Sequence, residues 1–424
     1  MIEAELNRNI IVRPYDGNIS NIVQDIINSR QVITHFQPII SLKNHTVFGI
    51  EALSRGMHSS SDIIPPNIMF EQAAALGMTI ELDRLCRDKA LTSFQPLNAL
   101  HPELFLFINF DPTILDKGAS GSEYLINSVK SRNLLPRNII IEMCESKTQN
   151  AERLKEFIQR YKRYGFLLAL DDIGIGYSNL DRILLTEPDI LKIDRCIING
   201  IDRDCHKQEI FSSIVNVSKK IGALIVAEGI ETEAEAITSC ELGADLLQGF
   251  YFARPQPANN QLTPHAFIPG IDSVHRKFKE HKVAKIILAE RNRQLFETIS
   301  YQLTNKLTGT DPEFFDEKLI ELARHPALEY LYILNQDGIQ VSNSICDACV
   351  SFQGPRKFLF NATHRGADQS LKDYYLYIHA GLTQYITAPY ISHASGNLCI
   401  TVSRVFTSAG QQFILCADFT ISPR

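Results

Sequence analysis

Side chains that carry ligand oxygens recur at the ends of short apolar segments in the N-terminal part of the sequence. Glu51 follows VFGI, Glu142 follows NIII, and Asp171 and Asp172 stand together after FLLAL. If these carboxylates converged without a counter-ion, they would repel one another and raise one another's pKa values, whereas a bound divalent cation would remove that cost. The residues of this kind are, in chain order, Glu51, Asn109, Glu142, Glu145, Asp171, Asp172, Asp194, Glu228, Glu231 and Gln248.

The ligand types indicate which metal such a site would hold. Oxygen ligands without a cluster of His or Cys favour Mg²⁺ or Mn²⁺ over Zn²⁺. The adjacent Asp171 and Asp172 would let one carboxylate bridge two ions, roughly 3.5–4 Å apart, while the other binds one of them. Such a pair activates water and neutralises a phosphate undergoing in-line attack, and Lys192 would hold the nucleophile or the developing charge. We therefore expect one or two Mg²⁺ or Mn²⁺ ions.

The elements that must position these residues form an alternating pattern of strands and helices. The strands expected from near-continuous apolar runs are 33–42, 47–53, 104–110, 138–144, 166–172, 190–194, 224–229 and 246–252, and such runs are typical of parallel strands covered on both faces. The expected helices are 69–77, 81–93, 150–164, 206–221 and 232–241; the last opens on Thr232 with Glu235 in a capping-box pattern.

This alternation predicts an α/β fold, a TIM-like (β/α)8 barrel, whose chemistry lies at the carboxyl ends of the strands. Only a few residues around 43–46 separate the first two strands. A parallel pair needs a longer crossover, so one of these two strands must run antiparallel to its neighbour.

Three segments are expected along the chain of 424 residues. The barrel takes 20–260, a connecting or dimerisation helix 273–307, and an α+β domain 310–424. The last has candidate strands at 329–334, 339–343, 398–406 and 411–419, with Asp337-Gly338 as a hairpin turn.

The composition disfavours two classes of binding partner, nucleic-acid polymers and membranes. The net charge is −6 and no long run of Lys and Arg appears, which disfavours a DNA or RNA polymer as ligand. No stretch approaches the roughly 18 apolar residues of a membrane span, and the N-terminus MIEAELNRNIIVRP lacks the apolar core of a signal peptide. We expect a cytoplasmic protein that does not bind membranes.

Several motifs, taken together and in order, resemble a known family. They are Gln37-Pro38-Ile39, Glu51-Ala52-Leu53-x-Arg55, FINF with Asn109, IEMCES at 141–146, DDIGIGYSNL at 171–180, LKID at 191–194, AEGIET at 227–232 and LLQGFYFARP at 246–255. The chain from about 20 to 258 thus resembles the EAL domain, the family of cyclic di-GMP-specific phosphodiesterases. The resemblance implies hydrolysis of one phosphodiester of cyclic di-GMP to linear pGpG.

The resemblance also implies roles for the motif residues. The implied ligands of the first metal are Glu51, Asn109, Glu142 and Asp171, and those of the second are Asp171, Asp172 and Glu228. Lys192 would contact the attacking water, and Glu228 is a candidate general base, so the base stays open between these two residues. The expected catalytic residues are therefore Lys192, Glu228 and Glu51.

The resemblance also implies which residues bind the substrate. The dinucleotide site would be lined by Gln37, Leu53, Arg55, Gln248 and Pro255, with Arg55 as the phosphate contact because a guanidinium suits planar recognition. Asp194 and Glu231 are read as substrate-binding, with a structural role as the alternative. Glu145 would support the loop Ile173–Leu180, the family's regulatory loop at the dimer face.

The C-terminal region is similar to PAS-like and Cache-type sensor modules. The segments that carry this similarity are Asp373-Tyr374-Tyr375, Ala388-Pro389-Tyr390, Ser395-Gly396 and the strand 400–406. It implies an unidentified small-molecule ligand and regulation of the barrel, and the alternative is a dimerisation module without ligand. We expect a homodimer.

Two other functions compete with that of an active phosphodiesterase. The first is a receptor that binds cyclic di-GMP without cleaving it, and the second is a signalling scaffold. The sequence departs from the family pattern at Cys144, Ile173 and Ile175, but no departure removes a metal ligand. The intact acids favour the enzyme, because unused acids clustered in one site would destabilise the fold.

Overall fold

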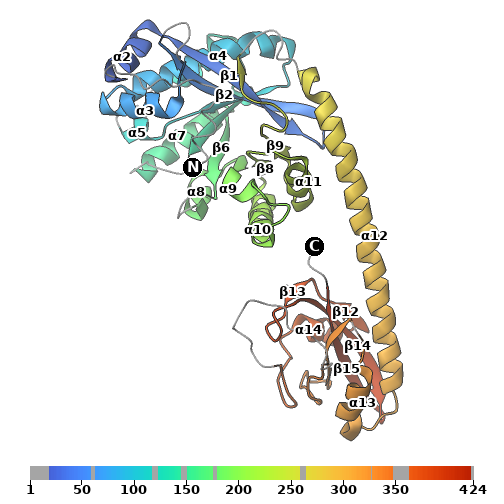
Figure 1. Ribbon diagram of the computed structural model, residues 1–424. Helices are drawn as coiled ribbons and strands as arrows, with labels where there is room; N and C mark the ends of the chain where they lie inside the picture. The colour runs from blue at the N-terminus through green and yellow to red at the C-terminus, as the bar shows by residue number, and fades with distance from the viewer. Residues whose placement is uncertain are drawn as a thin grey trace. The chain divides into compact units, whose positions relative to one another are not determined.

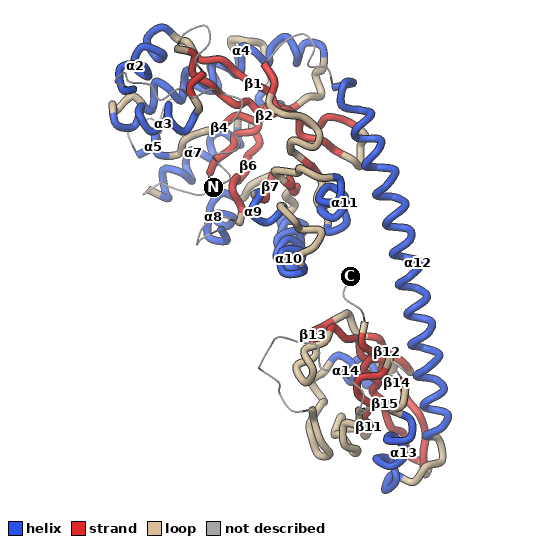
Figure 2. Tube along the Cα trace, viewed as in Figure 1, coloured by secondary structure: helices blue, strands red, loops and turns tan. Residues whose placement is uncertain are grey.

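The computed structural model describes residues 19–58, 63–116, 123–144, 150–174, 179–257, 264–325, 327–346 and 362–421 (Figure 1). The chain divides into two compact units, Met1–Lys282 and Val283–Arg424. Figure 2 shows the first unit as red strands surrounded by blue helices. Within the described residues, no helix combines the length and the apolarity needed to cross a bilayer.

The first unit is built on a closed ring of eight strands. The ring runs β1-β9-β8-β7-β6-β5-β4-β2, and a β1–β2 pairing closes it. Its strands are β1 (Val32–Ser41), β2 (Thr46–Met57), β4 (Phe105–Asn109), β5 (Ile139–Cys144), β6 (Leu167–Ile173), β7 (Ile190–Ile193), β8 (Leu224–Ala227) and β9 (Leu246–Leu247). The short β3 (Ile63–Ile64) pairs antiparallel with β2, and the short β10 (Gln256–Pro257) pairs antiparallel with β1. The expected barrel is confirmed.

The antiparallel member of the ring is β1. It pairs antiparallel with both β2 and β9, whereas β2 and the following strands pair parallel. The link between β1 and β2 spans only 42–45, which a hairpin can close and a parallel crossover cannot.

Helices cover the outside of the ring. Their bounds are α2 (Ile19–Ser29), α3 (Pro66–Ala75), α4 (Thr79–Leu100), α5 (Thr113–Asp116), α6 (Tyr124–Lys130), α7 (Ala151–Arg163), α8 (Asn179–Thr186), α9 (Arg195–Ile198), α10 (Cys205–Ile221) and α11 (Glu233–Leu242), with the 3-10 turn η2 (Pro136–Asn138) before β5. The expected capping box of α11 is present: the Thr232 side chain accepts from Glu235 N, and the Glu235 side chain accepts from Thr232 N.

The strand expected over 246–252 ends after two residues. Beyond it the chain turns toward the segment after β8, where Ile230 N donates to Gln248 O and Tyr251 N donates to Ile230 O, each at 3.0 Å. A Cβ on Gly249 would lie 2.1 Å from Ile230 O. Glycine therefore permits this close backbone approach, which the apolar run of the sequence did not reveal.

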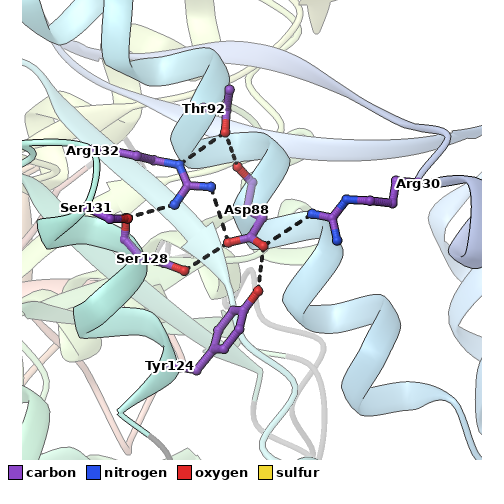
Figure 3. A network of polar contacts seen from close by, with 7 residues as sticks. All are labelled: Arg30, Asp88, Thr92, Tyr124, Ser128, Ser131 and Arg132. Atoms are coloured by element: carbon purple, nitrogen blue, oxygen red, sulfur yellow. Dashed lines mark hydrogen bonds and ion pairs between the residues drawn. The ribbon is translucent and has the colours of Figure 1, made fainter.

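Three N-terminal helices are joined by the carboxylate of Asp88, as Figure 3 shows. Asp88 lies on α4 and is 8% exposed. It accepts from Tyr124 at 2.5 Å and from Ser128 at 2.9 Å, both on α6, and its Oδ2 lies 3.4 Å from an Arg30 nitrogen just after α2. These contacts of the Asp88 carboxylate hold α2 and α6 against α4.

A long helix, α12 (Ile268–Leu307), follows the 3-10 turn η3 (Pro264–Phe267). Its first turns belong to the barrel unit, because Ile271 and Val274 are 0% exposed and lie in the barrel's main apolar cluster. Polar contacts add to this packing: Lys277 Nζ lies 2.7 Å from Glu233 on α11, and His281 Nδ1 lies 2.8 Å from Glu241.

The second unit contains an antiparallel sheet in the order β11-β15-β14-β12, with β13 beside β14. Its elements are η4 (Pro312–Phe314), α13 (Phe315–Leu322), β11 (Leu328–Leu334), α14 (Asp373–His379), β12 (Gln384–Ile386), β13 (Tyr390–Ile391), β14 (Leu398–Ser408) and β15 (Gln411–Thr420). One apolar cluster joins the sheet to α13 and the end of α12, and another joins it to α14.

Residues 339–343, which were expected to form a strand, are described in the structure but do not form one. Isolated bridges Leu334↔Gln340 and Leu331↔Ile345 stand in its place. The turn at Asp337-Gly338 does reverse the chain, with Gly338 at φ 81°. The following residues stay beside β11 through separate hydrogen bonds, such as Val341 N to Ile333 O at 2.8 Å, without forming a continuous ladder.

Candidate active site

The barrel interior determines which side chains reach the carboxyl ends of the strands. A layer of apolar side chains fills the barrel, one from each of several neighbouring strands. Side chains alternate between the two faces of a strand, so the residue two positions after each layer member points the same way, at the barrel mouth. The resulting pairs are Phe107 and Asn109, Ile140 and Glu142, Ala169 and Asp171, Ile190 and Lys192, Val226 and Glu228, and Leu246 and Gln248.

The ammonium of Lys192 lies at the centre of this mouth. Its side chain is 1% exposed, and the side chain of its carboxylate partner Glu142 is 0% exposed. The Lys192 Nζ atom lies 2.5 Å from Glu142 Oε1, 2.6 Å from Glu228 Oε1, 3.4 Å from Asp171 Oδ1 and 3.6 Å from Glu51 Oε2. Four carboxylates, three on β2, β5 and β6 and one directly after β8, therefore share one positive charge.

The pKa values reflect this imbalance. Burial, followed by repulsion from Glu51, raises the pKa of Glu142 well above its ordinary value, although Lys192 opposes the shift. Burial and the charge of Asp171 likewise raise the pKa of Glu228. Burial alone would lower the pKa of Lys192, but the attraction of the carboxylates outweighs it and raises that pKa. The site holds more negative charge than one ammonium neutralises.

Such a site fits an additional cation. Both carboxylate oxygens of Glu142 are buried and accept no hydrogen bond of ordinary geometry, although Oε1 forms the ion pair with Lys192. Within the described ranges, no three His, Cys, Asp or Glu side chains already surround a common metal position; the Lys192 ammonium lies between the acids. The donors are oxygens, which hard divalent cations prefer.

A chain of amides supports Glu51 from two sides. Gln248 Nε2 donates to Glu51 Oε2 at 2.5 Å and Asn109 Nδ2 donates to Glu51 Oε1 at 3.3 Å. Gln248 also donates to Gln37 Oε1 at 3.2 Å, and Gln37 in turn donates to Ala253 O at 3.0 Å. These contacts bring together side chains of β1, β2, β4 and the segment after β9.

The two adjacent aspartates lie at an irregularity in strand β6. The register between β6 and β7 shifts between Leu170 and Ile173, and Asp172 has φ 60°. A residue other than glycine in this region is strained, and a bulge redirects side chains at a strand end. The irregularity interrupts the regular alternation of side chains at this strand end, where Asp171 lines the pocket and Asp172 is not among its lining residues.

A pocket of about 200 Å³ opens over these groups. Its lining residues are Gln37, Glu51, Asp171, Lys192, Arg195, Glu228, Gly229, Glu231, Gln248, Gly249 and Phe250. The structure thus places seven of the expected site residues on its wall. Asn109 and Glu142 join them through their contacts with Glu51 and Lys192.

Other expected residues lie outside that lining. Asp194 caps α9, with its Oδ1 accepting from Cys196 N at 2.6 Å. Arg55 donates to the Ser54 carbonyl at 2.8 Å. Leu53 and Pro255 are partly exposed. Glu145, expected to support the loop after β6, lies outside the described residues, as does part of that loop.

Four pocket residues were not among the expected site residues: the glycines Gly229 and Gly249, and the side chains of Arg195 and Phe250. Arg195 follows the LKID segment directly, and Phe250 belongs to the LLQGFYFARP segment. Their positions directly after one motif and inside another are the features of the sequence that could have indicated a place in the site. The guanidinium of Arg254 lies 4.5 Å from the Phe250 ring centroid.

Comparisons with known proteins concern mainly the first unit. A family model described as the EAL domain matches residues 20–255. The bifunctional diguanylate cyclase/cyclic di-GMP phosphodiesterase MucR of Pseudomonas aeruginosa is 30% identical over 250 residues, which are 57% of this chain and 35% of MucR. This chain therefore spans about a third of the length of that relative.

Two solved structures are similar to this one. A complex of the MucR phosphodiesterase with cyclic di-GMP is 28% identical, with a TM-score of 0.53, and the match covers 57% of this chain and 99% of that chain. The YkuI protein of Bacillus subtilis, solved with cyclic di-GMP and calcium, covers 95% of this chain and 99% of its own at a TM-score of 0.79. Its identity is 23%, so this likeness concerns the fold alone.

Proposed function

This chain belongs to the EAL domain family, and from that premise we propose that it hydrolyses cyclic di-GMP to linear pGpG in a reaction that depends on a divalent metal. The observation that carries this proposal is the convergence of Glu51, Glu142, Asp171 and Glu228 on the Lys192 ammonium inside one pocket. Relatives named as cyclic di-GMP phosphodiesterases, MucR among them, support the choice of substrate.

The metal would be Mg²⁺ or Mn²⁺, as one or two ions. The residues proposed to hold it are Glu51, Asn109, Glu142, Asp171, Asp172 and Glu228. When bound, a divalent cation would lower the pKa of water and offset the charge of the phosphate. The excess of carboxylates over ammonium, together with the Glu142 oxygens that accept no ordinary hydrogen bond, supports this assignment.

The chain's own residues would orient water and accept its proton. Lys192 is an ammonium with donors only, so it holds the water oxygen toward the phosphorus. Glu228 Oε1, 2.6 Å from that ammonium, accepts the proton as the water oxygen bonds to phosphorus. The bond from phosphorus to the ribose 3′ oxygen breaks, and that oxygen takes a proton from solvent.

Substrate contacts are proposed for the residues around this centre. Gln37 and Gln248 lie on the pocket wall, where they position Glu51 and face the dinucleotide. Arg55, near the mouth on β2, would contact a phosphate with Leu53 and Pro255 beside the nucleotide. Asp194 and Glu231 complete the proposed substrate residues, and Glu145 would support the loop after β6.

The second unit is proposed to be a PAS- or Cache-like module that binds a small molecule and regulates the barrel. Its single antiparallel sheet with α13 and α14 packed against it supports a module of this type. We further propose the segments 20–260, 273–307 and 310–424 as barrel, connecting helix and sensor, and a homodimer as the working assembly.

Product formation tests the function directly. Wild type, Glu51→Ala and Asp171→Asn are incubated with cyclic di-GMP and Mg²⁺ or Mn²⁺, and pGpG is measured by chromatography. Each variant removes a carboxylate from the centre and is expected to lower the rate by on the order of 100-fold or more. The matched control is Glu156→Gln, at an exposed position on α7, which should retain the wild-type rate.

Two results would contradict the proposal. Equal rates in wild type and both site variants would show that Glu51 and Asp171 do not hold a metal that the reaction needs. Binding of cyclic di-GMP by wild type without any pGpG would identify a receptor instead of an enzyme.

A further inference from the structure

A buried ion pair on α4 holds the turn that follows Asn109. Asp83 Oδ1 accepts a hydrogen bond from the backbone nitrogen of Asp111 at 3.3 Å, two residues beyond the end of β4. The guanidinium of Arg87 pairs with Asp83 Oδ2 and lies 4.9 Å from the ring centroid of Phe110. The pair therefore contacts both residues that come directly after Asn109.

The burial of this pair indicates that it has a role beyond stability. The side chains of Asp83 and Arg87 are 2% and 6% exposed. Removing two charges from water is costly, and apolar side chains of similar volume often give equal or greater stability. What the pair supplies, and apolar side chains cannot, is an acceptor for the backbone nitrogen of Asp111.

The side chain of Asn109 depends on this turn for its position. Asn109 is an exposed residue at the end of β4, and its Nδ2 donates to Glu51 Oε1 across 3.3 Å, a long hydrogen bond that constrains the amide weakly. This donation leaves Asn109 Oδ1 as the atom that can bind a cation. The position of that oxygen is consequently set by the backbone at the end of β4.

The turn is also joined to a second residue proposed to hold the metal. Phe110 N donates to Glu142 O at 2.9 Å, and Asp111 Oδ1 accepts from Thr113 N at 2.9 Å at the start of α5. The backbone after Asn109 is thus held by β5 on one side and by α4 on the other. A change at the α4 side alters the position of the Asn109 amide relative to Glu142.

We propose that Asp83 and Arg87 are positioning residues for the metal site: Asp83 holds the turn through Asp111, and Arg87 holds Asp83 and packs on Phe110, so that the Asn109 amide stays where a divalent cation would bind. The proposal rests on the proposed function, because it concerns ligands of the same metal. Neither Asp83 nor Arg87 is among the residues that line the pocket, so both act through Asn109.

A double variant separates positioning from stability. Asp83→Leu/Arg87→Met replaces the ion pair by apolar side chains, so it should keep the wild-type unfolding temperature while the nitrogen of Asp111 loses its acceptor. The matched control is Asp88→Asn. Asp88 is another buried acid on α4, but its carboxylate contacts side chains of α6 and Arg30. This control should lower the unfolding temperature and leave the metal site unchanged.

Binding of Mn²⁺ to the full chain without nucleotide is measured by titration calorimetry, and unfolding by circular dichroism. The double variant should raise the dissociation constant for Mn²⁺ by about tenfold, a typical loss when a residue that orients a metal ligand is removed. Asp83→Asn/Arg87→Met keeps an amide oxygen that can accept from Asp111 N, and it should recover part of the affinity. Asp88→Asn should bind Mn²⁺ as wild type does.

The rate of pGpG formation gives a second measurement on the same variants. In Asp83→Leu/Arg87→Met the Mg²⁺ concentration that gives the half-maximal rate should rise by about tenfold. The rate at saturating Mg²⁺ should stay within about threefold of wild type, because the metal ligands themselves are intact.

Two results would overturn the positioning role. One is a stably folded Asp83→Leu/Arg87→Met variant that binds Mn²⁺ with wild-type affinity. The other is an equal loss of Mn²⁺ affinity in this variant and in Asp88→Asn, since that loss would come from a general loosening of α4.

Failure of the proposed function gives different results. If wild type binds Mn²⁺ but forms no pGpG, the hydrolase is wrong, and the dissociation constants for Mn²⁺ alone decide the role of Asp83 and Arg87. If wild type binds no Mn²⁺, the metal assignment and the positioning role are both wrong.

Discussion

Asp418, on strand β15 of the second unit, is a buried ionisable residue. Unlike Lys192, whose burial is offset by nearby carboxylates, it has no oppositely charged group among its hydrogen-bond partners in the described residues. Its side chain is buried, with 8% exposure, and Thr401 Oγ1 donates to its Oδ1 at 2.7 Å. Burial raises the pKa of this carboxyl from 3.8 to about 7. Neutral hydroxyl partners offset little of the cost of burying a charge, so Asp418 is protonated in mildly acidic solution.

This pKa predicts how stability changes with pH. The folded state binds the Asp418 proton more tightly than the unfolded state, so the contribution to stability is full below about pH 4 and is lost as pH rises to about 7. Between pH 5 and pH 8 we expect the second unit to lose roughly 2–3 kcal/mol of unfolding free energy. Asp418→Asn should remove this loss and be more stable than wild type at pH 8.

Urea unfolding at pH 5 and pH 8, followed by circular dichroism and tyrosine fluorescence, measures the effect. Asp373→Asn, at an exposed position on α14, serves as the control and should keep the wild-type pH dependence. The same pH dependence in Asp418→Asn would contradict a titrating Asp418.

At the scale of elements, the end of β9 and the segment after β8 support each other through backbone contact. Gly249 lies so close to Ile230 that an added Cβ would be 2.1 Å from its oxygen and 2.3 Å from its nitrogen. Both atoms of Ile230 are already hydrogen-bonded to residues on either side of Gly249. The contact aligns Gln248 with the segment that carries Glu228.

Gly249→Ala is therefore expected to push these two segments apart. We predict a loss of about 1–3 kcal/mol in unfolding free energy, typical of overpacking against backbone, and a dissociation constant for cyclic di-GMP raised by about tenfold. Thermal unfolding and calorimetric binding measure the two effects.

Gly270→Ala provides the comparison for this prediction. No atom lies within 4 Å of a Cβ added at Gly270, inside α12, so alanine should stabilise the helix by up to about 1 kcal/mol. Equal behaviour of the two variants would show that the backbone contact at Gly249 has no consequence.

At the scale of the whole molecule, each unit has its own apolar core, and α12 contributes to both. Its Ile271 and Val274 are buried in the core of the barrel unit, whereas Phe296, Ile299 and Leu303 are buried in that of the second. A cut that separates the units without damaging the barrel must therefore fall after Lys282, where the first unit ends.

Two truncations test regulation separately from stability. A chain that ends at Lys282 should fold and keep its nucleotide preference, with a changed turnover rate or assembly state. A chain that ends at Gly270 lacks Ile271 and Val274 and should lose about 3–5 kcal/mol of stability, as for two large deletions from a core. Kinetics, sedimentation and thermal unfolding distinguish these outcomes. Unchanged rate and assembly in the longer truncation would exclude a regulatory second unit.

Much of the barrel was predictable from the sequence because strand patterns are local. Apolar runs located the strands, and the short connection around 43–46 required one antiparallel pair. The residues that end those runs, such as Glu142 and Asp171, point into the barrel mouth because side chains alternate along a strand. Family motifs added roles that alternation cannot supply.

Only the tertiary structure decided which side chains meet. Gln248 contacts Glu51 across 197 residues of sequence, and this contact exists because β1 closes the ring between β2 and β9. The pocket positions of Arg195 and Phe250 depend on how the segments after β7 and β9 turn. Such contacts depend on ring closure and backbone packing, and the local periodicity of a sequence contains neither.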